Sequence, residues 1–132
     1  MIRSAVAAAV VAAHGGGAIV VGSTALWLHG EDIAVNDLDL VPHPSSLDAL
    51  PSALEPLCCL STVPRRTELC RSDIVSRDTS FGRVDLLVER GRRDFERLAT
   101  HAVTLPVMGI PVLVASSQDA WDLRHRFKDL DA

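Results

Sequence analysis

Two aspartates separated by one apolar residue are the best candidates in this chain for chemistry. Asp37 and Asp39 alternate with Leu38 and Leu40 in a segment that is typical of a strand. Because residues two apart in a strand point to the same face, the two carboxylates project together, roughly 6.6–7 Å apart along the chain. Burying an unpaired carboxylate is strongly unfavourable, so the pair predicts a cationic partner. A hard cation such as Mg²⁺, which takes oxygen ligands and keeps sites for phosphate and water, fits such a pair.

A Gly-Ser turn upstream could supply a phosphate site. Gly22 and Ser23 follow the apolar run 18–21 and open a helix expected over 24–29. A strand that runs through such a turn into a helix leaves free backbone N–H groups where a phosphate can sit. Gly and Ser also begin many helices without any ligand. Beside the acidic strand, however, the turn indicates a role in holding the β- and γ-phosphates of a nucleotide.

These two elements together carry a resemblance to a known family. The string Val21-Gly22-Ser23, a spacer of thirteen residues and the string Asp37-Leu38-Asp39-Leu40 resemble the signature of the nucleotidyltransferase (DNA polymerase β-like) superfamily. They are similar in particular to small prokaryotic nucleotidyltransferases, including those of toxin–antitoxin pairs. The resemblance implies a mixed sheet flanked by helices, of the α/β (α+β) class.

Two later segments extend the resemblance over most of the chain. The superfamily has a third catalytic acid on a later strand, and Asp85, within the apolar segment 83–88, matches it. The tail 121–130 resembles the terminal helix of such proteins, where a Lys-Asp pair is common, here Lys128-Asp129.

The resemblance also implies a role for each matching residue. Gly22 and Ser23 would hold the phosphates of a nucleoside triphosphate, which Lys128 would reach from the last helix. Two Mg²⁺ ions held by shared carboxylates would activate an attacking hydroxyl and neutralise the triphosphate and the leaving pyrophosphate. The catalytic residues and metal ligands would then be Asp37, Asp39 and Asp85.

Each of these residues has a structural interpretation as well. The Asp37–Asp39 pair could be acids on a solvent-facing strand edge. Asp85 could form an ion pair with Arg83, two residues earlier on the same face. Lys128 could be a cation favoured at a helix C-terminus.

Length and composition indicate one soluble globular domain over 1–132, with 48% apolar and 23% charged residues. The N-terminus, Arg3 followed by the apolar stretch 5–13, imitates a secretory signal, but an alanine-rich helix packed on the sheet is the simpler interpretation. No apolar run reaches the roughly 18–20 residues of a membrane span. We therefore expect a cytoplasmic protein without a membrane partner. The net charge of −4 gives no global attraction to nucleic acid.

Other reactive residues indicate no second site. Cys58, Cys59 and Cys70 have no metal-ligand or disulfide spacing, which predicts reduced thiols. The chain has no Gly-Lys-Ser/Thr sequence, so a P-loop is excluded.

The pattern of apolar residues, turns and caps predicts the order α-β-α-β-α-β-β-α-β-β-α. Prolines at 106 and 111 predict that the last two strands both lie at sheet edges. Ser116 is expected to cap the last helix. The expected strands cover 18–21, 37–41, 67–75, 83–88, 103–107 and 110–114, and the expected helices cover 2–13, 24–29, a short stretch from 45 to Pro51, 92–100 and the tail from 116.

The sequence thus predicts an Mg²⁺-dependent nucleotidyltransferase that moves a nucleoside monophosphate from a triphosphate, with ATP the first candidate, to a hydroxyl. The acceptor could be RNA such as tRNA, a protein or a small molecule. A toxin–antitoxin partner or a homodimer could complete the acceptor side. Two other hypotheses stay open: a catalytically silent nucleotide-binding or antitoxin-type module with the same fold, and a domain whose aspartates bind a structural ion.

Overall fold

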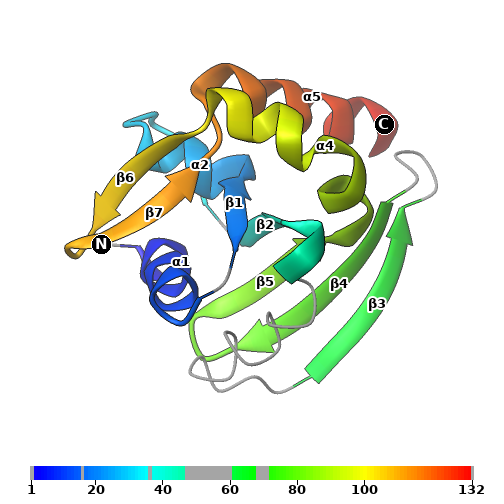
Figure 1. The fold of residues 1–132 in the computed structure, drawn as a ribbon. Coiled ribbons are helices and arrows are strands. Elements are labelled where there is room, and N and C mark those ends of the chain that lie inside the picture. Colours follow the sequence, from blue (N-terminus) through cyan, green and yellow to red (C-terminus); the bar gives the residue numbers. More distant parts are fainter. Residues whose placement is uncertain (1, 16, 36, 47–60, 68–71, 132) are drawn as a thin grey trace.

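A mixed sheet forms the centre of the protein (Figure 1). The computed structural model describes residues 2–15, 17–35, 37–46, 61–67 and 72–131. In this part of the chain seven strands lie in the order β3-β4-β5-β2-β1-β7-β6. The strands are β1 (Ala18–Val21), β2 (Leu38–Pro42), β3 (Ser61–Thr67), β4 (Ser72–Thr79), β5 (Gly82–Leu87), β6 (Val103–Val107) and β7 (Ile110–Val114). The helices are α1 (Arg3–Ala13), α2 (Gly22–Leu28), α4 (Val88–His101) and α5 (Ser117–Asp131), with a 3-10 turn at Pro44–Ser46.

The strand directions make the sheet mixed. β2 runs antiparallel to β1 and parallel to β5, and β7 runs parallel to β1. The pairs β3–β4, β4–β5 and β6–β7 are antiparallel. β1 therefore ends on the same side of the sheet on which β2 and β5 begin. The expected α/β (α+β) class, a mixed sheet flanked by helices, is confirmed.

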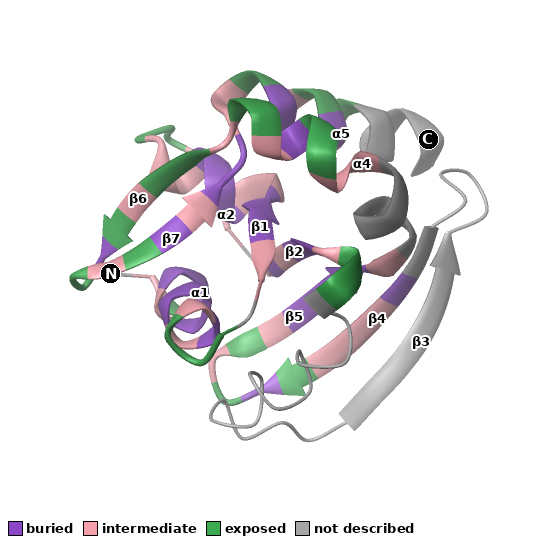
Figure 2. Ribbon diagram, viewed as in Figure 1, coloured by how far each residue is buried: buried purple, intermediate pink, exposed green. Residues whose placement is uncertain are grey.

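The two faces of the sheet bury separate hydrophobic clusters. Leu38 and Leu40 of β2 belong to one cluster, with the alanines of α1, whose small side chains allow close packing on the sheet. Val41 belongs to the other, with Leu98 of α4 and Leu123 of α5. Figure 2 shows the buried segments gathered in the central strands and in α1. Since side chains alternate along a strand, Asp39 lies on the same face as Val41, the face that α4 and α5 cover.

The strand expected over 67–75 is confirmed from Ser72, where β4 begins, whereas residues 68–71 lie outside the described residues. β3, which ends at Thr67 and pairs antiparallel with β4, was not predicted. The sequence of β3, Ser-Thr-Val-Pro-Arg-Arg-Thr, hides the strand, since it lacks alternating apolar residues and contains a proline.

The expectation of two edge strands is half right. β6 lies at the end of the described sheet, whereas β7 lies inside it, between β1 and β6. Pro111 is tolerated there because β1 is short. Val20 pairs with Val114, so the four-residue β1, which starts at Ala18, does not extend as far as Pro111. The missing N–H of the proline therefore costs no hydrogen bond to β1.

The helices agree with the sequence except in two places. The helix expected over 92–100 is longer, because α4 starts at Val88 directly after β5. Only the 3-10 turn Pro44–Ser46 is described of the helix expected from residue 45. The rest of that segment and the three cysteines lie outside the described residues. Among the described helices, none is long and apolar enough to cross a membrane.

Candidate functional site

Three polar residues form a row across three adjacent strands. The parallel pairing of β2 and β5 places Asp39 directly opposite Asp85. The antiparallel pairing of β4 and β5 places Ser76 opposite Asp85 on its other side. Residues that lie directly opposite share a face and have their Cβ atoms roughly 4.5–5.5 Å apart. We call Asp39, Asp85 and Ser76 the polar row; it crosses β2, β5 and β4 at the level of the second residue of β2.

Gly22 packs directly against this row. Its neighbour Val21 pairs with Asp39, and the chain then turns into α2 with Gly22 at a φ of +69°. A Cβ atom at this position would lie 2.5 Å from Asp39 Oδ2, well inside van der Waals contact. Glycine is required here for two reasons: the left-handed backbone and the closeness of the carboxylate. The turn and the acid that the sequence linked are therefore in contact.

The start of β2 is tied to α2 by a buried hydroxyl. Thr24 Oγ1 donates a hydrogen bond of 2.9 Å to the carbonyl oxygen of Asp37, and Thr24 is fully buried. Asp37 lies one residue before β2 rather than inside it, and Ser23 lies half-buried in the first turn of α2. No pattern in the sequence singles out Thr24 as a site residue. Its bond fixes the Gly-Ser turn relative to the acidic strand.

Asp85 is buried and held by two donors. Its side chain is 7% exposed, and Oδ1 accepts hydrogen bonds from Arg83 Nε at 2.9 Å and from Ser76 Oγ at 2.5 Å. The carboxylate in turn raises the pKa of the Arg83 guanidinium, chiefly through that hydrogen bond. The ion pair with Arg83 that the sequence offered as a structural interpretation of Asp85 is therefore present.

Asp39 is the electrostatically unfavourable member of the row. Burial, followed by repulsion from Asp85 and Asp37, raises its pKa from 3.8 to about 7, although Arg83 opposes the shift. Asp39 also shares a side-chain hydrogen bond with Asp85. A nearby positive charge would stabilise the ionised form of Asp39 and lower its pKa.

The residues fit a hard divalent cation in their chemistry. Three carboxylates at the edge of a sheet, one of them repelled by the other two, are the oxygen ligands that Mg²⁺ takes. In the arrangement described here, no group of three or more His, Cys, Asp or Glu side chains among the described residues is already set to hold a metal ion. Asp39 and Asp85 are instead hydrogen-bonded to each other. Metal binding would therefore replace that bond.

Lys128, the remaining site residue expected from the sequence, lies in α5. The structure places its backbone in this helix, whereas its side chain lies outside the described residues. The role expected for Lys128 stays a prediction.

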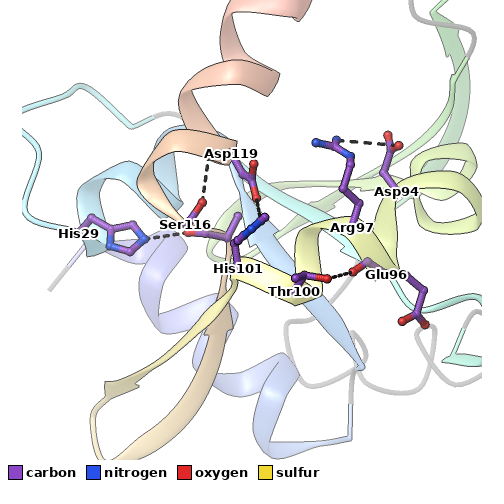
Figure 3. Close-up of polar contacts among 9 residues, drawn as sticks. His29, Asp94, Glu96, Arg97, Thr100, His101, Ser116 and Asp119 are labelled. Carbon is purple, nitrogen blue, oxygen red and sulfur yellow. Dashed lines mark hydrogen bonds and ion pairs between the residues drawn. The ribbon is translucent and has the colours of Figure 1, made fainter.

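A second polar cluster joins α4 to α5 (Figure 3). Ser116 Oγ accepts a 3.1 Å hydrogen bond from the Asp119 backbone N–H, which confirms the predicted cap. Asp119 is 9% exposed, and its Oδ2 lies 3.6 Å from His101 Nδ1 at the end of α4. His29, at the end of α2, bonds the Ala115 carbonyl oxygen at 2.7 Å. These contacts connect helix ends, and a helix N-terminus favours the Asp119 charge.

Comparison with solved structures identifies the fold. The chain superimposes on a protein from Thermotoga maritima that carries the provisional name nucleotidyltransferase, with a TM-score of 0.66 over 89% of this chain and 77% of the other, at 14% identity. It also superimposes on a provisionally named nucleotidyltransferase from H. pylori, with a TM-score of 0.52 over 90% of this chain and 54% of the other, at 13% identity. No family model and no curated protein matches the sequence. The chain has the nucleotidyltransferase fold.

Proposed function

We propose that this chain, built on the fold of nucleotidyltransferases, transfers a nucleoside monophosphate from a nucleoside triphosphate to a hydroxyl and releases pyrophosphate. One observation carries the proposal: Asp39 and Asp85 face each other on adjacent parallel strands, directly beneath a glycine turn that has no room for a side chain. ATP is the first candidate among the triphosphates.

The acidic side chains would hold the metal. Asp39 and Asp85, with Asp37 at the start of β2, would bind Mg²⁺, with a two-ion site as the expected form. When bound, Mg²⁺ neutralises phosphate charge and lowers the pKa of a coordinated hydroxyl. The chain contributes the placement of these carboxylates, since strand register fixes Asp39 opposite Asp85. On loading, Asp39 would lose its proton and its hydrogen bond to Asp85.

The turn into α2 would position the triphosphate. Gly22 lets the backbone approach Asp39 closely, so that phosphates placed over the turn would lie beside the metal ligands. Ser23 would donate to a phosphate oxygen from the first turn of the helix. Thr24 holds the turn against Asp37 and would keep the two halves of the site aligned. Lys128 is proposed as a further triphosphate contact.

The acceptor side is open in this proposal. A tRNA or other RNA, a protein side chain and a small molecule are the three acceptor classes. A partner protein, as in a toxin–antitoxin pair, or a second copy of the chain would complete that side. A cytoplasmic location would supply the triphosphate.

The test is transfer of label from α-³²P nucleoside triphosphates. Purified protein is incubated with each of the four triphosphates and Mg²⁺, with total tRNA and a cell lysate as acceptors. Asp39→Asn is the control, because it removes the charge and keeps the shape. Label in RNA or in a protein band, absent with the variant, supports the proposal and identifies the acceptor class. No label under any condition contradicts it.

A second candidate is a nucleotide-binding or antitoxin-type module without turnover. The pairing of Arg83 with Asp85 favours it, because this acid already has a cationic partner from its own chain. Triphosphate binding without transfer, or binding to a partner protein that survives Asp39→Asn, would support this candidate. Metal binding without triphosphate affinity would instead indicate a structural ion.

A further inference from the structure

The hydroxyl of Ser76 belongs to the polar row but not to the motif that marks the fold. Its Oγ donates to Asp85 Oδ1 at 2.5 Å, across the antiparallel pair β4–β5. Ser76 itself is half-buried. The contact follows from register, because the two residues lie directly opposite each other.

The order of the strands determines what this bond does to Asp85. β5 lies between β4 and β2, so Ser76 is on one side of the Asp85 carboxylate and Asp39 is on the other. Oδ1 already accepts two hydrogen bonds, from Ser76 and from Arg83. The side chain is buried and cannot rotate freely. The carboxylate is therefore held toward β4 through Oδ1 while it shares a hydrogen bond with Asp39 on the β2 side, the bond that a cation would replace.

The two donors differ in how they respond to a cation. A divalent ion at the carboxylates repels the Arg83 guanidinium, whose charge sits 2.9 Å from Asp85 Oδ1. The Ser76 hydroxyl is neutral and is not repelled. It can therefore keep its hydrogen bond while metal and triphosphate enter and leave.

We propose that Ser76 is a positioning residue for the metal site: it fixes the Asp85 carboxylate so that one oxygen stays with β4 and the other is presented beside Asp39 to a divalent cation. This inference rests on the proposed function and deepens it, because it adds a residue that lies outside the Gly-Ser and double-Asp motif. Residues that hydrogen-bond a metal-binding carboxylate without contacting the metal typically contribute about 10–100-fold in metal affinity or activity.

The test is Mn²⁺ affinity of the purified protein without nucleotide, measured by electron paramagnetic resonance, together with transfer activity as a function of Mn²⁺ concentration. Ser76→Ala removes the hydroxyl, and Ser76→Thr retains it. Thr104→Ala is the matched control, because it removes a hydroxyl from an exposed position on β6, at the far end of the sheet. Thermal unfolding of each metal-free variant verifies that it folds.

We expect Ser76→Ala to bind Mn²⁺ about 10-fold or more weakly and to need a correspondingly higher Mn²⁺ concentration for half-maximal transfer. Ser76→Thr and Thr104→Ala should stay within about 3-fold of the unmodified protein, well inside that range. Equal affinity in Ser76→Ala and the unmodified protein would overturn the inference, and so would equal losses in the Ala and Thr variants. Absence of Mn²⁺ binding in the unmodified protein would instead contradict the metal site of the proposed function.

Discussion

Two carboxylates of this protein, Asp119 and Asp39, have opposite surroundings. Asp119 lies in the first turn of α5, next to a serine cap and 3.6 Å from His101, where the helix dipole favours a negative charge. Asp39 lies across from Asp85, and burial and like charges raise its pKa to about 7. Folding alone accounts for the first arrangement, because it stabilises a helix end. The second costs stability unless a cation binds there, which is typical of a functional site.

The largest expected effect comes from a substitution that removes the charge of a carboxylate and keeps its shape, made once in each region. Asp39→Asn should lower transfer activity at least about a thousandfold, since a metal ligand supplies several kcal/mol of transition-state stabilisation. Asp119→Asn should leave activity within about 3-fold, because it removes at most about 1 kcal/mol of helix-end electrostatics. Initial rates at saturating triphosphate measure both. Similar losses of transfer activity in the two variants would contradict the view that only the Asp39 region is catalytic.

Gly22→Ala should give the next largest effect. The new Cβ would be strained by a φ of +69° and would lie 2.5 Å from Asp39 Oδ2. Left-handed backbone costs roughly 1–2 kcal/mol, and displacement of the carboxylate should add about a hundredfold loss of activity. Gly15→Ala is the control, since its φ is +81° and a Cβ there would meet nothing within 4 Å. Urea unfolding measures the cost of the strained backbone, and transfer rates measure the displacement of the Asp39 carboxylate. Equal losses of stability and activity in the two variants would contradict the close packing at Gly22.

The raised pKa of Asp39 predicts how stability depends on pH without metal. The folded protein holds this proton up to about pH 7, whereas the unfolded chain releases it near 3.8. The folded state therefore binds more protons in that interval, so the free energy of unfolding should fall as pH rises from about 4 to about 7. Urea titrations at several pH values measure the slope.

Two comparisons isolate the contribution of Asp39 to that slope. Asp39→Asn should flatten it, because the titrating group is gone. Adding Mn²⁺ near pH 7 should raise the stability of the unmodified protein and leave Asp39→Asn nearly unchanged. A slope that survives in Asp39→Asn would assign the pH dependence to other groups.

The smallest expected effect concerns the cap of α5. Ser116→Ala removes the acceptor for the Asp119 backbone N–H and should lower the free energy of unfolding by about 1 kcal/mol. Transfer activity and Mn²⁺ affinity should not change, because the cap joins helix ends rather than the polar row. Ser116→Asp, which can still cap, is the matched variant and should keep the stability. A loss of Mn²⁺ affinity in Ser116→Ala would show that the two regions are coupled.

The sequence predicted most of the fold because local signals were strong. The alanine-rich run, the Gly-Ser turn and the Ser116 cap each correspond to a helix end or a helix in the structure. β3 was missed because it lacks alternating apolar residues and contains a proline. The interior place of β7 could not be predicted locally, since it depends on pairing with the distant β1, which is too short to reach Pro111.

The site was predictable where its residues match the family pattern, which includes Asp85 as well as the Gly-Ser and double-Asp motif. Gly22 and Asp39 belong to one motif, and the structure brings them into contact. Ser76 and Thr24 contribute through strand register and a long-range hydrogen bond, which no pattern in the sequence reveals. Arg83 could be paired with Asp85 from the sequence, because residues two apart in a strand share a face. The metal and acceptor assignments stay predictions.

The central claim is that Asp39 and Asp85 hold a divalent cation beside a triphosphate. The most direct measurement is the anomalous scattering of Mn²⁺ in crystals grown with Mn²⁺ and α,β-methylene-ATP. The account predicts Mn²⁺ within about 2.0–2.3 Å of oxygens of Asp39 and Asp85, as for hard divalent ions, with the triphosphate over the turn at Gly22. Mn²⁺ bound elsewhere, or a bound nucleotide with no metal at these two carboxylates, would contradict it.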